Sequence, residues 1–212
     1  MVRSILGVAK LMIGRGVESV RGNEDRIVVE APDERDSETL GFTRSSLGPG
    51  HLEWLKALPL RRVAFGRVLC CHGTPARDDE WLLERVAKAG VTLATSDDLA
   101  ATLAGIREMV VLCGHSHVPR AVLLPGGRLV VNPGSVGLPA YTDAAPWPHA
   151  MESGSPHARY AVLEETDAGW RVEQVAVPYD WEAAASAAER NDRPDWAEWL
   201  RTGRAQVAES GR

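Results

Sequence analysis

Apolar side chains at helical spacing open the chain. Between residues 2 and 13 they recur every three or four positions, and Gly14 and Gly16 end the run, which predicts a helix. Residues 17–20 then predict a very short strand that leads to Gly22. The polar, charged segment 30–46 predicts a surface excursion, and residues 51–58 predict a short helix that Pro59 closes.

The rest of the chain first alternates between strands and helices and then consists mainly of hairpins. Short apolar runs next to glycine-containing turns predict strands over 62–65 and 67–71 (turn at Gly66), 109–113, 121–124 and 129–131 (turn at Pro125-Gly126-Gly127), 159–165 and 170–177. Helices are predicted over 79–89, from a Ser96 N-cap to residue 104, and from 180 onward, with a proline- and glycine-rich loop over 137–156.

This succession predicts an α/β protein in which two sheets pack face to face with helices outside. A chain of 212 residues with 44% hydrophobic residues can bury one sizeable core. We therefore expect a single domain over residues 1–212.

Charge and cysteine usage narrow the class of protein. A net charge of −5 and a pI near 5.7 disfavour nucleic acid as the main partner, because such proteins usually carry a basic surplus. Cys70, Cys71 and Cys113 do not resemble a secreted disulfide framework, and core packing explains them better than a structural zinc site. With no span-length apolar stretch and no cleavage-site pattern, we expect a soluble, cytoplasmic protein without membrane contact.

Three of the six histidines follow predicted strands and stand next to glycine. His72 lies in Cys71-His72-Gly73, and the other two lie in Gly114-His115-Ser116-His117. Ligands bind at strand ends in α/β folds, and flanking glycines let a metal or phosphate approach the backbone. Two histidines one residue apart can aim at neighbouring points only if the chain turns sharply. Each histidine alone could be an ordinary surface or core residue, but together they predict a metal site.

Four short motifs, in this order, resemble the later motifs of the calcineurin-like metallophosphoesterase superfamily over about residues 17–177. They are Gly22-Asn23-Glu24-Asp25, Cys71-His72-Gly73, Gly114-His115-Ser116-His117 and Asn132-Pro133-Gly134-Ser135. The resemblance implies a four-layer α/β/β/α sandwich of two mixed sheets. It also implies a metal-dependent phosphoesterase with two divalent ions of the Mn, Fe, Zn or Ni type. In such enzymes a hydroxide between the ions attacks the phosphorus of a phosphomonoester or phosphodiester.

The resemblance also assigns roles to single residues. It implies that Asn23, His72 and His115 hold the second metal and that His117 helps to hold the first. Arg26 and Arg120 follow two of the motifs and are candidates for contacting the substrate phosphate, although arginine is also common on surfaces. The motif that starts at Asn132 is expected to shape the loop beneath the metals rather than to bind them.

The first departure from the family pattern concerns the catalytic candidates, Glu24 and Asp25. Glu24 stands where many relatives have a histidine that stabilises the phosphate or protonates the leaving oxygen. A glutamate can donate a proton only if burial or neighbours raise its pKa; otherwise it only hydrogen-bonds within the loop. Asp25 resembles the partner that orients the histidine in relatives, and this role is open when the histidine is replaced.

The second departure is larger. No aspartate precedes Asp25 and no histidine precedes His51, so the D-x-H and G-D motifs of the family are missing with their metal ligands. The chain resembles a domain that begins inside a β-α-β unit, N-terminally incomplete. We hypothesise a misassigned start codon or a truncated gene, which the upstream DNA would test. With His117 alone from the first-metal set, the site would hold one ion rather than two.

The sequence is therefore compatible with three alternative functions. The first is a phosphoesterase that acts on a small phosphorylated substrate or a phosphoprotein. The second is a non-catalytic relative that binds a metal or another ligand. The third is a nucleotide-binding α/β protein in which the histidines are incidental.

Overall fold

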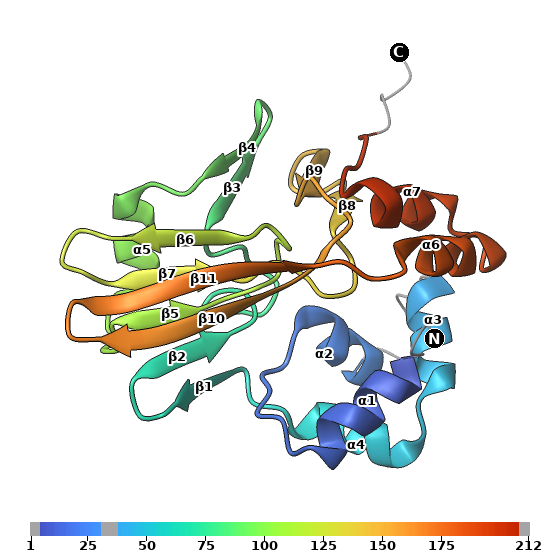
Figure 1. Cartoon of the computed structure of the whole chain (residues 1–212), viewed down its shortest axis with the longest axis horizontal. Coiled ribbons are helices and arrows are strands. Elements are labelled where there is room, and N and C mark those ends of the chain that lie inside the picture. The colour runs from blue at the N-terminus through green and yellow to red at the C-terminus, as the bar shows by residue number, and fades with distance from the viewer. Residues whose placement is uncertain (1–4, 31–37, 208–212) are drawn as a thin grey trace.

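The computed structural model describes residues 5–30 and 38–207, whose arrangement is shown in Figure 1. Four short helices come first: α1 (Ile5–Gly14), α2 (Asn23–Glu30), α3 (Glu38–Ser46) and α4 (Pro49–Ala57). The helices α2, α3 and α4 share an apolar cluster around the buried side chains of Val28, Leu40 and Leu55. The N-terminal helices thus form a group of their own beside the sheet (Figure 1).

A mixed five-stranded sheet forms the centre of the molecule, in the order β1-β2-β5-β7-β6. Its strands are β1 (Arg61–Ala64), β2 (Val68–Cys71), β5 (Val110–Leu112), β6 (Arg120–Leu123) and β7 (Leu129–Asn132). The inner strands β2, β5 and β7 are parallel, whereas the edge strands β1 and β6 run antiparallel to their neighbours. The loops that follow β2, β5 and β7 therefore start side by side at one edge of the sheet.

Three two-stranded sheets and three more helices complete the described part of the chain. The sheets pair β3 (Glu84–Ala87) with β4 (Gly90–Leu93), β8 (Ala140–Asp143) with β9 (His149–Glu152), and β10 (Ala158–Thr166) with β11 (Gly169–Val177). The helices are α5 (Ser96–Thr102), α6 (Trp181–Arg190) and α7 (Pro194–Thr202).

The β10–β11 hairpin lies across the central sheet (Figure 1). Gln174 of β11 donates from Nε2 to the backbone oxygens of Arg120 at 3.3 Å and Asn132 at 3.0 Å. The hairpin is therefore tied to β6 and β7 through a side chain rather than through strand pairing.

The main apolar core lies between the central sheet and α5. Leu69, Val111 and Val130 are neighbours in register across β2, β5 and β7. They pack with Leu99 of α5 and with Leu103, the C-cap residue of that helix. These five side chains are almost fully inaccessible to solvent. Burial of apolar surface of this kind stabilises the fold by roughly 25 cal/mol per Å². This core therefore stabilises the sheet that carries the strand-end loops.

Most predicted elements are confirmed. The first helix appears as α1 within the described residues, the helix before Pro59 as α4, and the predicted strands as β1, β2, β5, β6, β7, β10 and β11. The α/β class is also confirmed, as a mixed five-stranded sheet with small sheets and flanking helices. None of the described helices has the length and apolarity needed to cross a lipid bilayer.

Two predictions in the first part of the chain are wrong. Residues 17–20 form no strand, because no strand of the described chain pairs with them. The expected surface excursion contains α3, which packs through Leu40 onto its helical neighbours; residues 31–37 of that segment lie outside the described residues.

Three later predictions are wrong as well. The expected helix over 79–89 is instead an irregular segment of turns and bends over 79–83, followed by β3 and the turn into β4. Leu82 and Leu83 are neighbours that are both buried, and Gly90 has a φ of 118°. The expected loop over 137–156 contains β8 and β9, whose Met151 is buried. Helix α5 is capped by Thr95 rather than by Ser96.

The end of α7 provides a test of the packing. Gly203 has a φ of 64°, and a Cβ added there would lie 2.3 Å from the backbone of Ser155. We expect Gly203→Ala to lower the free energy of unfolding by about 2 kcal/mol or more, measured by urea denaturation. The control is Gly50→Ala in α4, where nothing lies within 4 Å. Equal stabilities of the two variants would contradict this packing.

Candidate functional site

Two loops that carry histidines leave the same edge of the central sheet. His72 directly follows β2, and His115 and His117 follow β5. The backbone N–H of Gly114 donates to the backbone oxygen of His72 at 2.7 Å, so the two loops are joined where they begin. The ring centroids of His72 and His115 lie 5.2 Å apart. The structure thus brings the strand-end histidines together.

The chain turns sharply at His115 and His117. Both residues have positive φ angles, 66° and 61°, which are strained for residues with a side chain. Asn132, which is fully buried, holds this turn by donating from Nδ2 to the Gly114 oxygen at 2.8 Å and to Ser116 Oγ at 3.0 Å. Asn132 therefore shapes the loop from below, which is the role expected for its motif.

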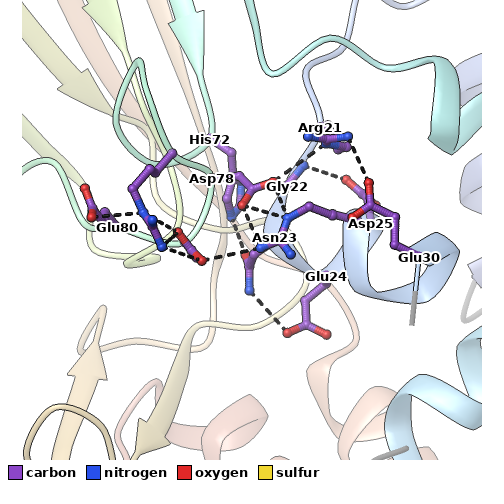
Figure 2. Close-up of polar contacts among 12 residues, drawn as sticks. Arg21, Gly22, Asn23, Glu24, Asp25, Glu30, His72, Asp78 and Glu80 are labelled. Carbon is purple, nitrogen blue, oxygen red and sulfur yellow. Dashed lines mark hydrogen bonds and ion pairs between the residues drawn. The ribbon is translucent and has the colours of Figure 1, made fainter. Parts of the chain in front are cut away.

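The helix α2 brings an amide oxygen to His72. Asn23 is the first residue of α2, and its Oδ1 lies 3.0 Å from His72 Nε2 (Figure 2). Gly22, just before the helix, lies against the same ring, and a Cβ there would come within 3.2 Å of ring atoms. The glycine therefore permits the close approach of α2 to His72.

The three histidines are mostly neutral at pH 7. Burial lowers the pKa of His72 to about 4, and the neighbouring His115 and His117 act in the same direction. Burial also lowers the pKa of His117 to about 4. Burial lowers the pKa of His115 too, although a hydrogen bond with the backbone of Asp79 and nearby carboxylates oppose this shift. Neutral imidazoles keep a lone pair that can bind a cation.

The chemistry of these donors fits a divalent metal ion. Asn23 Oδ1 and His72 Nε2 are hydrogen-bond partners at 3.0 Å, so the two donor atoms lie next to each other. Octahedral coordination, with ligands at right angles about 2.1 Å from an ion, would place them about as far apart. His117 Nδ1 is buried and has no hydrogen-bond partner in the described part of the chain. Within residues 5–30 and 38–207, no three His, Cys, Asp or Glu side chains are placed to hold an ion. The amide of Asn23 is therefore needed for a three-donor set with His72 and His115.

Two aromatic side chains that sequence reasoning did not select for the site enclose the histidines. Trp81 stacks on His115 with 5.5 Å between the ring centroids, and Tyr141 makes an edge contact with His117 with 5.1 Å between the ring centroids. Trp81 Nε1 donates to the Tyr141 hydroxyl at 2.9 Å, and that hydroxyl donates to the His115 backbone oxygen at 3.2 Å. Burial raises the pKa of Tyr141, so the hydroxyl keeps the proton that it donates. Trp81 and Tyr141 lie far from each other in the sequence and in no motif, so no sequence signal marks them.

The predicted catalytic carboxylates lie in the first turn of α2. Glu24 is exposed and accepts a hydrogen bond from Asn23 Nδ2 at 3.3 Å. Asp25 Oδ2 accepts from the backbone N–H of Gly22 at 2.8 Å, as a residue that caps its own helix does. Burial raises the pKa of Asp25, and for the more exposed Glu24 partial burial and the Asp25 charge act in the same direction. Asp25 therefore stabilises the helix start, whereas Glu24 is the carboxylate in contact with Asn23.

Both predicted phosphate-binding arginines are paired with buried carboxylates. Arg26 donates from Nε and Nη2 to Asp78 at 2.9–3.1 Å, and Arg120 Nε donates to Glu84 Oε1 at 2.8 Å. Burial alone would raise the pKa of Asp78, but the hydrogen bonds and charge of Arg26 outweigh it and hold the pKa below its ordinary value. For Glu84 burial prevails and raises the pKa despite its contact with Arg120. Contact of either arginine with a substrate stays a prediction.

Comparison with known proteins decides the family. Residues 4–147 match the family model of the calcineurin-like phosphoesterase superfamily domain, which is more than half of the chain. The chain belongs to the calcineurin-like phosphoesterase superfamily. No curated protein is similar enough in sequence to count as a match.

Two solved structures resemble this superfamily member at low sequence identity. A metallophosphoesterase from Sphaerobacter thermophilus is 21% identical with a TM-score of 0.64, and the similarity covers 88% of this chain and 76% of that one. A hypothetical protein from Pyrococcus horikoshii OT3 is 18% identical with a TM-score of 0.68, over 95% of this chain and 81% of that one. These likenesses show a metallophosphoesterase-like fold.

The hydroxyl of Tyr141 gives a test of the superfamily site's architecture. We expect Tyr141→Phe to lower the free energy of unfolding by about 1–3 kcal/mol, because Trp81 Nε1 and the His115 oxygen lose a buried partner. Tyr160→Phe makes the same chemical change on β10, where the side chain is 47% exposed, and should have little effect. Equilibrium urea unfolding measures both, and two equal losses would show that the Tyr141 hydroxyl has no special role.

Proposed function

We propose that this chain is a metal-dependent phosphoesterase that hydrolyses a phosphomonoester or a phosphodiester. The observation that carries the proposal is the 3.0 Å approach of Asn23 Oδ1 to His72 Nε2, with the neutral ring of His115 beside them. Its membership in the calcineurin-like phosphoesterase superfamily, which typically binds divalent metals, supports the same function.

The chain's own residues divide the work at such a site. Asn23, His72 and His115 would hold one divalent ion, and His117 would provide a ligand at a neighbouring point. When bound, divalent ions supply a water that ionises near neutral pH and positive charge next to the phosphate oxygens. Glu24 is the proposed proton donor to the leaving oxygen, since its raised pKa favours the protonated form that this step requires.

We also propose a class of substrate and a finer description of the fold. The net charge of −5 supports a small phosphorylated molecule or a phosphoprotein over a nucleic acid. The β10–β11 hairpin, which Gln174 ties to the face of the central sheet, supports a four-layer α/β/β/α sandwich in which the hairpin belongs to the second sheet.

A second candidate function is metal binding without catalysis. Within the described ranges no carboxylate joins the histidines in a set that could hold an ion. Beside the set of Asn23, His72 and His115, only His117 is a candidate ligand for a second ion in that part of the chain. A single ion held by neutral ligands alone would bind phosphate oxygens but would leave hydrolysis slow.

Metal content and turnover test the proposed function together. The purified protein is incubated with Mn²⁺, Fe²⁺, Zn²⁺ or Ni²⁺, dialysed and analysed for bound metal, and then assayed with an aryl phosphate and a bis-aryl phosphate. We expect bound metal and metal-stimulated turnover. We expect His115→Ala to abolish metal uptake, because it removes one of three ligands from the set.

The matched control is His51→Ala on α4, where the His51 ring accepts a hydrogen bond from the backbone N–H of Gly48, the residue before that helix. This variant should bind metal as the unaltered protein does. Bound metal without turnover would support the second function instead. Uptake that does not depend on His115 would refute the proposed site.

A further inference from the structure

The candidate metal site lies between two parts of the molecule that pack separately. The helix that carries Asn23 belongs to the apolar cluster around Val28, Leu40 and Leu55. The loop that carries His72 belongs to the sheet, whose cluster has different members. The distance between Asn23 and His72 is therefore not fixed by one common core, and contacts between the two parts contribute to setting it.

Ion pairs centred on Asp78 join the two parts beside the site. Arg26, which lies three residues after Asn23 on α2, donates to both carboxylate oxygens of Asp78, at 2.9, 3.0 and 3.1 Å. Asp78 lies six residues after His72, and its side chain is only 5% exposed. Arg21 Nε approaches the same carboxylate at 3.6 Å. Figure 2 shows Asp78 next to Arg21, Gly22, Asn23 and His72.

The loop that carries Asp78 is held firmly relative to His72. Gly73 follows His72, and a Cβ on it would lie 2.5 Å from the Glu80 oxygen and 2.7 Å from the Arg77 oxygen. Thr74 N–H donates to the Arg77 oxygen at 2.8 Å, and Arg77 N–H donates to Thr74 Oγ1 at 3.1 Å. This folded-back loop holds Asp78 at a fixed place beside His72. A bidentate arginine–carboxylate pair constrains orientation as well as distance.

We propose that Arg26 and Asp78 are positioning residues that set Asn23 against His72, so that metal affinity depends on an ion pair that does not touch the metal. The proposal rests on the proposed function, because it requires that a divalent ion binds at Asn23, His72 and His115. Outer contacts that orient metal ligands typically contribute about 10- to 100-fold to metal affinity.

The proposal assigns Arg26 a different role from contact with the substrate phosphate. Arg26 donates to Asp78 from both Nε and Nη2. Arg26 Nη2 also lies 3.4 Å from Asp79 Oδ2. If Arg26 positions Asn23, then Asp78→Asn and Arg26→Gln should have the same effect. If Arg26 bound the substrate, only its own replacement would raise KM, and metal affinity would not change.

The experiment measures Mn²⁺ affinity by isothermal titration and the absorption spectrum of bound Co²⁺. It compares the unaltered full chain with Arg26→Gln, Asp78→Asn and the double variant. We expect each single variant to bind Mn²⁺ about 10- to 100-fold more weakly and to change the Co²⁺ spectrum. The double variant should bind Mn²⁺ about as weakly as the worse single variant, because the Arg26–Asp78 pair, which has the shortest of these contacts, is lost in all three.

The control is Arg171→Gln, which removes an arginine from an exposed pair with Glu164 on the β10–β11 hairpin. It should leave both readouts unchanged. Circular dichroism checks that each variant is folded, and Arg26→Lys, which keeps the charge but not the bidentate geometry, replaces Arg26→Gln if that variant unfolds.

Two outcomes would overturn the inference in distinguishable ways. Folded Asp78→Asn that binds Mn²⁺ as the unaltered chain does would refute the positioning role and leave the proposed function standing. An unaltered chain that binds no Mn²⁺, Co²⁺ or Zn²⁺ would refute the proposed function and the positioning role together.

Discussion

The approach of the Asn23 amide oxygen to the His72 ring, at 3.0 Å, is the contact on which the arrangement of the site depends. It joins the helical group to the central sheet at the point where the strand-end loops meet. The second half of the site is a strained turn, with positive φ at His115 and His117, that a buried Asn132 stabilises from below. Strain of about 1–3 kcal/mol at each such residue persists only where neighbouring contacts enforce it. Ligand positions are thus set by the protein before any ligand binds.

Simple sequence rules predict the edge of the sheet at which the histidines lie. Apolar runs at 67–71 and 109–113 are typical of buried parallel strands, and these strands end next to His72 and His115. Parallel strands present their carboxyl ends at one edge, so residues 43 positions apart come together without further information. The spacing of the two neighbouring histidines required a sharp turn if both were to face one site, and the positive φ angles of His115 and His117 meet that condition. The link from Asn23 to His72 was different, because it came from the family resemblance and not from any periodicity.

The contacts that the sequence did not predict join loops to one another. The ion pair of Arg26 with Asp78 spans 52 residues, and the hydrogen bond of Trp81 with Tyr141 spans 60. Each depends on how the loops are placed after the sheet has formed, and no local pattern records that. The segment 79–89 was misleading for a related reason. Its apolar residues have helical spacing, but the neighbours Leu82 and Leu83 are both buried in an irregular segment, and Val86 lies in β3.

We propose that one divalent ion binds where the amide of Asn23 meets the rings of His72 and His115. The most direct test is a crystal structure of the unaltered chain soaked with Mn²⁺, with anomalous diffraction data that locate the metal. We expect an anomalous peak about 2.1–2.3 Å from Asn23 Oδ1 and His72 Nε2. A fully occupied peak elsewhere, or none under conditions in which the protein takes up Mn²⁺, would contradict it.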